Sequence, residues 1–509
     1  MSTGITNLRT IVQERIRVQR DTPEPVEYVD TGHVLSDATA RQNHVIFGRR
    51  GCGKTLLLHE AERRVKTNVK VVYVNCEDYK QHSFPNVLIE ILDQLFKELE
   101  TNLTAWFGRK RRSKELIQEI RAELQKLKRA PDERQASVKE SSSAENATVS
   151  AVGISAQGMR VGVDEHAAEK AAIQKEYKEY DDKIRDLNLL LPKLKDRIKD
   201  FFNLSTEVKS VFIALDDFYH LPRNIQPHVA DYVHRLCKDV PLYFKFATLR
   251  HASALFADRG KQPIGVQERH DYQPINVDFT FENFGRTSAQ LKQILYAYGD
   301  KAGMTKREID DLFMGEGFNR LVLAAGGVPR DFLSLLLEAL STKPAGEERI
   351  GKDDVRLLSL QVFQRRIQEL KVDSEKRDQD LLLKGINSIT RFCLQRQENV
   401  FLVPDQALQE QNGLRELLNR LLDYRIIHSV ATALTHKTYS GTFTAYALDI
   451  GAYAKYRKLE GRFEEVDITS RDAREMCRNS PVLDRDTLLN LLNKAPADPY
   501  EGLPEEIGE

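Results

Sequence analysis

The sequence predicts an α/β fold built around a parallel β-sheet, and three stretches of it carry this prediction. The stretch "VIFGRRGCGKTLLLHEAE", from Val45, has the pattern of a short strand, a glycine-rich loop and a helix. In "VFIALDD", five apolar residues precede Asp216 and Asp217. Two further apolar runs begin at Val69 and Leu242. Continuous apolar runs of this length are typical of parallel strands that are buried on both faces.

The size and charge of the chain limit its class. Its 509 residues are too many for one core, so roughly three or four domains are expected. The 76 Lys and Arg residues balance 76 Asp and Glu residues, so any nucleic-acid surface must be a local patch. We expect no membrane span, because no apolar run approaches the roughly 20 residues that one requires. We also expect no secretory signal, because the first residues contain no apolar block of the kind that marks one. Five scattered cysteines without C-x-x-C spacing indicate a reducing, cytoplasmic setting.

The glycine-rich loop fits the phosphate-binding pattern G-x-x-x-x-G-K-[ST]. Its glycines let backbone amides close around phosphates, and the following helix adds its positive end. Lys54 is expected to reach the β- and γ-phosphates and Thr55 to ligate Mg²⁺, so ATP and Mg²⁺ are the expected cofactors. The nucleotide-binding candidates here are Gly48, Arg49, Arg50, Gly51, Cys52, Gly53, Lys54, Thr55 and Leu56.

A phosphate-binding loop needs an acidic partner on a neighbouring buried strand, and the pair Asp216 and Asp217 supplies it. The pair follows a buried strand, and we expect Asp216 to join Thr55 in holding the magnesium ion. Asp217 lies where a residue that positions the attacking water is expected. The alternative is that the pair is two acids in an ordinary turn.

Polar residues at the ends of the other predicted elements extend the site. Asn75 ends one apolar run, and Thr248 and Arg250 end another. Arg330 lies in the first turn of the helix predicted in "GGVPRDFLSLLLEAL". A positive charge in the first turn does not stabilise a helix, so we expect the Arg330 side chain to contact a ligand instead.

Together these motifs resemble the AAA+ ATPases of the origin-recognition initiator clade and the related STAND signalling ATPases. The resemblance covers roughly residues 25–345, less one insertion, and rests on four motifs in order. It implies that Asn75 restrains the second acid until a partner binds. It also implies that Thr248 and Arg330 are the two sensor residues, and that Arg250 contacts the γ-phosphate as in STAND proteins. The catalytic candidates are Lys54, Asp216, Asp217, Thr248, Arg250 and Arg330.

Some details depart from the initiator pattern or extend it. Asp217 stands where that clade usually has Glu, and its shorter carboxylate predicts slow hydrolysis. The resemblance implies that Tyr28 and Val29 pack against the adenine. An arginine finger is not identifiable; Arg235 and Arg259 are candidates, or else solvated surface residues.

The second and third apolar runs are separated by about one hundred residues more than a crossover needs. Heptad spacing in two stretches predicts a coiled-coil hairpin at residues 105–200, whose tip is either a small β-hairpin or a disordered linker. The basic residues 109–112 could contact phosphates or simply be solvated. The seam positions are Ile117, Ile120, Leu124 and Leu127, then Ile173, Tyr177, Tyr180, Ile184, Leu187 and Leu191.

The C-terminal half has the element order of a winged helix, the module that follows the lid in the initiator clade. Its candidate groove helix carries Arg415, Arg420 and Arg425. In STAND proteins the same module locks the ADP state, so DNA binding and autoinhibition both stay open. The expected parts are an N-terminal segment with the adenine-side loop at 1–42, an AAA+ core at 43–285 that contains the 105–200 hairpin, a helical lid at 286–345, a linker helix at 346–378, a winged-helix domain at 379–457 and a flexible C-terminal tail at 458–509.

The sequence thus predicts an ATP-binding AAA+ switch ATPase of low turnover, which is expected to form an ATP-dependent homo-oligomer. Two outputs are open. An initiator-like protein would act on double-stranded DNA, in replication, in a mobile element or in defence against one. A STAND-like signalling ATPase of bacterial antiviral defence would instead act through a protein partner on the coiled-coil hairpin, without DNA.

Overall fold

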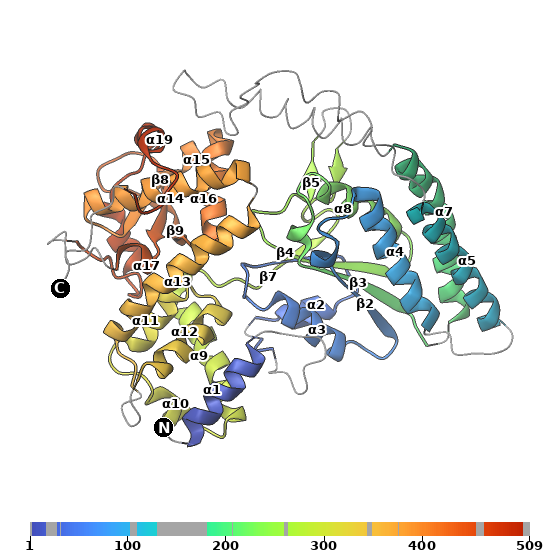
Figure 1. Cartoon of the computed structure of the whole chain (residues 1–509), viewed down its shortest axis with the longest axis horizontal. Helices are drawn as coiled ribbons and strands as arrows, with labels where there is room; N and C mark the ends of the chain where they lie inside the picture. The colour runs from blue at the N-terminus through green and yellow to red at the C-terminus, as the bar shows by residue number, and fades with distance from the viewer. Residues whose placement is uncertain are drawn as a thin grey trace.

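The structure is a computed structural model, in which an α/β core lies at one end and a helical lid and a C-terminal unit lie at the other (Figure 1). No helix in the part of the chain described combines the length and apolar character needed to cross a membrane. The residues that the structure describes are 3–16, 28–30, 32–101, 109–129, 181–205, 207–258, 263–343, 349–374, 376–454 and 463–501.

The core is built on a five-stranded parallel sheet. In spatial order, the strands are β2 (Val69–Asn75), β3 (Ser210–Asp216), β4 (Leu242–Thr248), β1 (His44–Phe47) and β7 (Gln273–Asn276). Every residue of β3 is buried, as expected for an inner parallel strand. The predicted α/β fold with a parallel sheet is therefore confirmed, with β7 as a strand that the sequence did not reveal.

Helices cover both faces of this sheet. They are α2 (Val34–Thr39) and α3 (Lys54–Arg64) on one face, and α4 (Phe84–Thr101) and α8 (Gln226–Cys237) on the other. Because side chains alternate along a strand, Val211, Ile213 and Leu215 pack with α4 and α8, whereas Phe212 and Ala214 pack with α3. A two-stranded hairpin, β5 (Phe256–Ala257) and β6 (Ile264–Gly265), follows β4.

Two helices of the insertion lie beside α4 (Figure 1): α5 (Arg109–Arg129) and α7 (Asp181–Leu204). Their predicted seam positions Ile117, Ile120, Leu124, Ile184, Leu187 and Leu191 are buried in the same apolar cluster as α4. Arg121 of α5 also pairs with Asp93 at 2.9 Å and Glu100 at 2.8 Å on α4. These parts of the insertion therefore form a layer of the core rather than a free arm. The seam positions Ile173, Tyr177 and Tyr180 and the predicted tip lie outside the described residues.

The lid consists of α9 (Phe284–Lys301), α10 (Lys306–Asp310), α11 (Gly317–Ala324) and α12 (Pro329–Ser341). An N-terminal helix, α1 (Thr3–Arg15), packs on α9 and α12 and buries Ile5, Leu8 and Val12 in the apolar cluster of the lid. The helix α13 (Lys352–Asp373) leads from the lid to the C-terminal unit.

The C-terminal unit has a helix, a strand, two helices and two strands in sequence. They are α14 (Lys376–Arg396), β8 (Val400–Pro404), α15 (Asp405–Glu410), α16 (Asn412–Asp423), β9 (Ile427–Thr435) and β10 (Thr442–Leu448), followed by α17 (Ile450–Tyr453). The strands form an antiparallel sheet in the order β8-β10-β9. The apolar residues of this unit belong to one cluster with those of the lid, so the two parts share a core.

Residues 463–501 correct the expectation of a flexible tail. They contain α18 (Ala473–Met476) and α19 (Arg485–Lys494), and α19 packs on α14. The Leu402 amide of β8 donates to the carbonyl of Pro481 at 2.9 Å, and the Leu483 amide donates back to Leu402 at 2.8 Å. Phe463 and Leu488 are buried in the shared core, which is why this segment is ordered despite its acidic, proline-containing end.

Candidate functional site

The glycine-rich loop joins β1 to α3 at the carboxyl edge of the sheet. Gly51 and Gly53 both have φ of 89°, a left-handed conformation that favours glycine. A Cβ on Gly51 would lie 2.9 Å from side-chain atoms of Val328 and Arg330. Glycine is therefore required both for the turn and for the close approach of the lid.

Lys54 and Thr55 are the first two residues of α3, at the positive end of that helix. The Lys54 Nζ donates to the carbonyls of Gly48 at 2.9 Å and Arg49 at 3.3 Å, and burial lowers the pKa of this ammonium group. A phosphate in the loop would offer it an anionic partner in place of neutral carbonyls.

The acidic pair lies at the end of β3. Asp216 is buried, and it accepts hydrogen bonds from the Tyr73 hydroxyl at 2.7 Å and from the Asp217 amide at 2.9 Å. Asp217 is half-buried in a left-handed conformation, and burial together with the Asp216 carboxylate raises its pKa to about 6. Asp216 and Thr55 are oxygen donors, the ligand type that Mg²⁺ prefers, so these residues suit that ion.

Asn75 lies at the end of β2, but its side chain caps the next turn. Its Oδ1 accepts from the Glu77 amide at 3.1 Å. The side chains of Glu77 and His220 offer atoms within 4.8 Å of the Asp217 carboxylate. The structure thus brings two groups to Asp217 that the sequence did not suggest.

The end of β4 carries the candidates Thr248 and Arg250. Thr248 is fully buried and its hydroxyl bonds with that of Ser253. The Arg250 guanidinium lies 4.3 Å from the ring centroid of Phe47, the residue before the loop, and pairs with Glu268 at 3.5 Å. Both residues are near the phosphate loop, and both already have partners in the chain.

Three other candidates meet at the lid side of the loop. The amide of Arg330 donates to the carbonyl of Gly51 at 3.3 Å. Tyr28 lies beside Gly53, since a Cβ there would be 3.7 Å from the Tyr28 ring, and Gln290 of α9 donates to the Val29 carbonyl at 2.9 Å. The structure therefore places Tyr28, Val29 and Arg330 where the loop and the lid meet.

The side chains of two loop residues, Arg49 and Cys52, anchor the loop to the segment after β7. The Arg49 guanidinium donates to Asp278, just after β7, at 2.7 Å and to the carbonyl of Phe279 at 3.0 Å. Cys52 Sγ donates to Asp278 at 3.3 Å. Burial raises the pKa of Asp278, but the Arg49 guanidinium outweighs it and holds that pKa below its ordinary value.

The C-terminal unit contacts the loop directly. The Arg425 guanidinium donates through Nη1 to the carbonyl of Arg50 at 2.8 Å. Asp423 accepts from the amides of His251 at 3.2 Å and Ala252 at 2.9 Å, in the segment after β4. Neither contact was predicted, because the only local signal is a pair of charges in "DYR" between two apolar runs.

A buried charge network extends this contact into the lid. Asp331, next to Arg330, pairs with Arg366 of α13 and with Arg425, each at 3.3 Å. Arg366 also pairs with Asp449, whose Oδ2 lies 2.9 Å from His428 Nε2. Buried ion pairs therefore connect the lid, α13 and the C-terminal unit beside the phosphate loop.

The predicted groove helix was expected to carry Arg425, but α16 ends at Asp423, where its last residue accepts hydrogen bonds from the core. The structure corrects the expectation for Arg425, which is buried against the loop and cannot enter a DNA groove here. Arg420 donates to a carboxylate of α14 at 2.7 Å, and Glu416 pairs with Arg223 of the core. Arg415 stays exposed on this helix.

Neither arginine-finger candidate can be assigned to a nucleotide site from the described residues. Arg235 donates to Asp231 at 2.8 Å and to Asn188 at 2.9 Å, so it has local partners in the chain. Arg259 lies outside the described residues.

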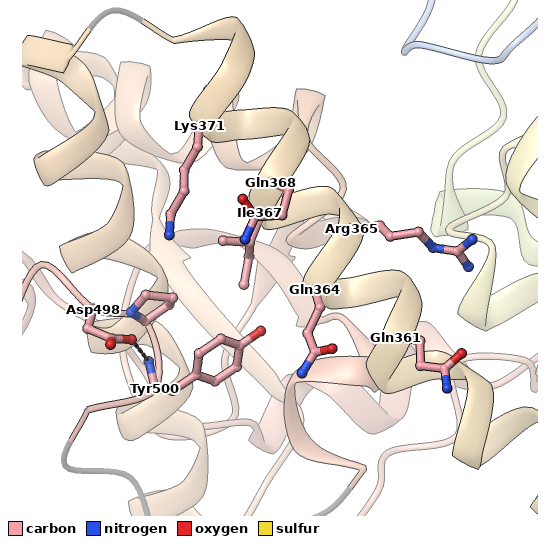
Figure 2. A pocket seen from close by; sticks show the side chains of 9 residues that line it. Gln361, Gln364, Arg365, Ile367, Gln368, Lys371, Asp498 and Tyr500 are labelled. Atoms are coloured by element: carbon pink, nitrogen blue, oxygen red, sulfur yellow. Dashed lines mark hydrogen bonds between the residues drawn. The ribbon is translucent and has the colours of Figure 1, made fainter.

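A cavity of about 590 Å³ lies elsewhere, between α13 and the segment around Tyr500 (Figure 2). Its wall includes Gln364, Lys371 and Asp498, and the Tyr500 amide donates to the Asp498 carboxylate at 2.9 Å. None of its lining residues belongs to the phosphate loop, so it is separate from the candidate nucleotide site.

Comparison with known proteins supports the class of the core. Residues 38–139 match a family of AAA domains, a segment that contains the phosphate loop and β2. Together with the five-stranded parallel sheet, this match defines an α/β P-loop core of the AAA+ type. A search of curated proteins found no match.

Three solved structures that resemble this chain do so at low sequence identity. A Walker-type ATPase of Pyrococcus abyssi is 11% identical, with a TM-score of 0.37, over 86% of this chain and 99% of that one. A single-substitution variant of RuvB from Thermotoga maritima is 13% identical with a TM-score of 0.29, over 82% of this chain and 90% of that one. A STAND protein with a tetratricopeptide repeat sensor from Pyrococcus horikoshii is 12% identical with a TM-score of 0.28, over 90% of this chain but 45% of that one.

Proposed function

We propose that the protein is a slowly hydrolysing ATP switch in which the C-terminal unit closes on the nucleotide site. The contact that carries this proposal is the donation from Arg425 to the Arg50 carbonyl, in the middle of the phosphate loop. A loop held in this way cannot change its shape without affecting the C-terminal unit. Nucleotide state and domain position are therefore coupled.

The residues of the site suggest how ATP would be held. Lys54 would bind the β- and γ-phosphates, and Thr55 and Asp216 would hold Mg²⁺, which neutralises phosphate charge when bound. Asp217 would position the attacking water. Its shorter carboxylate, compared with a glutamate, is the reason we propose slow turnover.

The lid supplies the coupling step. Arg330 lies on the loop, where it can contact a bound phosphate, and its neighbour Asp331 pairs with both Arg366 and Arg425. A shift of Arg330 toward a γ-phosphate would move Asp331 and disturb both pairs. Because buried ion pairs depend strongly on geometry, a small shift is enough to favour an open form.

We propose that the C-terminal unit is a winged helix that serves as the lock of a STAND-like signalling ATPase. Its element order suits that fold, and the end of α16 and the residues that follow it contact the core. An initiator-like protein would have to open before α16 could meet DNA. The observed contacts therefore favour output through a protein partner, in a setting such as bacterial antiviral defence, with ATP-dependent self-association in the open form.

Distance measurements can test this proposal. All five cysteines are buried, so fluorophores can be placed selectively on Lys238→Cys in the core and Ser440→Cys in the C-terminal unit, two exposed positions. We expect high energy transfer with ADP and lower transfer with a non-hydrolysable ATP analogue. Equal transfer in both states would refute the switch. Duplex DNA is then titrated in both states across a salt series, and tight, salt-dependent binding would favour the initiator-like alternative.

The substitution Asp217→Glu is predicted to raise ATP turnover by about tenfold, because the longer side chain reaches the attacking water better. Phosphate release under single-turnover conditions measures the chemical step directly. Asp217→Asn, which cannot accept a proton, serves as the control and should lower the rate. A rate for Asp217→Glu that equals or falls below that of the parent protein would contradict the prediction.

Closure is also predicted to depend on pH through Asp423. Burial raises the pKa of this carboxyl to about 7 in the closed form, despite hydrogen bonds from His251 and Ala252 that lower it. Its ordinary pKa is about 4, so the closed form binds the proton more strongly and falling pH favours closure. This contribution is complete below about pH 4 and is lost as pH rises through about 7.

Two histidines act in the opposite sense, so a variant must isolate Asp423. Burial lowers the pKa values of His251 and His428 to about 4, and their protonation below about pH 6.5 would oppose closure. Asp423→Asn keeps an oxygen acceptor for both amides but does not titrate. Relative to this variant, closure of the parent protein should strengthen by up to about tenfold per pH unit below pH 7. Parallel energy-transfer profiles from pH 8 to 5 would exclude this role.

A further inference from the structure

We propose that Glu77, Asp217 and His220 form a site for a divalent transition-metal ion such as Zn²⁺ or Co²⁺, distinct from the magnesium that accompanies ATP. Glu77 lies in the 3₁₀ turn η1 (Cys76–Tyr79) after β2, and His220 ends the turn η2 (Phe218–His220) after β3. Since β2 and β3 are parallel neighbours, their carboxyl ends bring these turns together.

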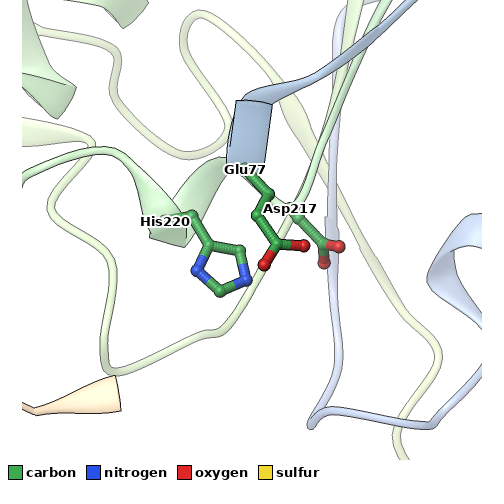
Figure 3. A group of neighbouring side chains, drawn as sticks. All are labelled: Glu77, Asp217 and His220. Atoms are coloured by element: carbon green, nitrogen blue, oxygen red, sulfur yellow. The ribbon is translucent and has the colours of Figure 1, made fainter. Parts of the chain in front are cut away.

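The distances suit a metal site that closes on its ion. One ligand atom from each residue lies within 4.8 Å of the other two, and Figure 3 shows the Glu77 side chain gathered with those of Asp217 and His220, which share the turn after β3. Donors bound about 2.0–2.1 Å from a tetrahedral ion lie roughly 3.4 Å apart. Small side-chain rotations therefore complete the site. All three residues are half-buried, so the ion can enter and water can fill the remaining positions.

The donor set indicates the class of ion. An imidazole nitrogen with two carboxylates suits Zn²⁺ or Co²⁺, whereas Mg²⁺ prefers oxygen donors alone. The adjoining Asp216 carboxylate adds a third negative charge at this edge of the sheet, which favours a dication. The Lys80 ammonium lies 3.8 Å from Glu77, a long contact between side chains that are both more than 40% exposed, and such a contact competes weakly.

Occupation of this site would regulate the proposed hydrolysis. In this respect the inference rests on the proposed function, since it takes Asp217 as the residue that positions water. A carboxylate bound to the ion cannot also orient the attacking water. Metal binding and turnover would therefore compete for one side chain, and the ion would hold the protein in its ATP-bound form.

The test is titration of the nucleotide-free full chain with Co²⁺, followed by its visible absorption, with Zn²⁺ as the competitor. One bound ion with an imidazole-containing spectrum is expected. His220→Ala and Glu77→Gln should each weaken binding by at least about tenfold. His234→Ala is the matched control, because His234 is half-buried but lies near one carboxylate, Asp271, at 3.6 Å. That variant should bind as the parent protein does.

A second control separates this site from the magnesium site. Thr55→Ala removes a proposed magnesium ligand and should leave Co²⁺ binding unchanged. Equal Co²⁺ affinity in His220→Ala and the parent protein, or no bound Co²⁺ at millimolar concentration, would overturn the proposal. Binding of a fluorescent ATP analogue is measured in the same samples, so a failed nucleotide site is recognised independently of a failed metal site.

Discussion

Replacing Lys54 by alanine is expected to reduce ATP affinity by about 100-fold or more. The ammonium is buried at the start of α3, and its partners in the structure are two neutral carbonyls. A phosphate would therefore gain a charge-assisted contact that the variant cannot make, worth on the order of 3 kcal/mol. Titration with a fluorescent ATP analogue gives the affinity, and the rise in melting temperature with added ATP reports the same loss.

The control for this prediction is Lys66→Ala, since Lys66 is an exposed lysine just after the same helix. Lys54→Ala should still fold, because removing a buried ammonium also removes its desolvation cost. Its melting temperature without nucleotide checks this point. Retained ATP affinity in a folded Lys54→Ala protein would show that the loop is not the nucleotide site.

The parts of the fold that were predictable are those with local signals. The run before Asp216 is apolar at every position, and all of β3 is buried, so composition alone marked an inner strand. β7 escaped notice because "QPIN" is short and contains a proline. Likewise, the heptads of the insertion correctly marked apolar faces, but spacing cannot say whether such a face meets a partner helix or the core.

The candidate site likewise has a part that local motifs predicted and a part that they could not. Lys54, Asp216 and Arg330 lie in motifs that span a few residues, and the structure brings Arg330 onto the loop as the motif order implied. The contact between Arg425 and the Arg50 carbonyl joins positions that are 375 residues apart. No local pattern encodes a pairing of that kind, because it depends on how the lid, α13 and the C-terminal unit pack.

The choice between the two outputs also follows from this packing. From its sequence alone, the arginine-bearing helix of the C-terminal unit is equally suited to a DNA groove and to a protein contact. In the structure, Arg425 is buried as deeply as many apolar core residues, with 1% of its surface accessible. A side chain committed in this way contributes to coupling within the chain, so its removal tests the switch directly.

Replacing Arg425 by alanine is expected to open the C-terminal unit and to speed ADP release by at least about 100-fold. The variant loses the hydrogen bond to Arg50 and the ion pairs with Asp331 and Glu369. Removing one partner of a buried ion pair costs up to about 3–5 kcal/mol, and the lower end applies here because Glu369 is partly exposed to solvent. Asp331 keeps its pair with Arg366, so the lid itself should stay folded. Energy transfer between the core and the C-terminal unit and stopped-flow ADP release measure the two effects.

Two further variants separate the switch from simple destabilisation. Arg415→Ala removes an exposed arginine from α16, the helix that ends just before Arg425, and should change neither readout; Arg415 bonds only locally, to Asn412 at 2.7 Å. Arg425→Lys keeps a charge but cannot serve three partners in different directions, so it should fall between the parent protein and Arg425→Ala. Circular dichroism confirms that each variant is folded. If folded Arg425→Ala shows parental energy transfer and ADP release, the C-terminal unit is not the lock, and nucleotide state must act through another contact.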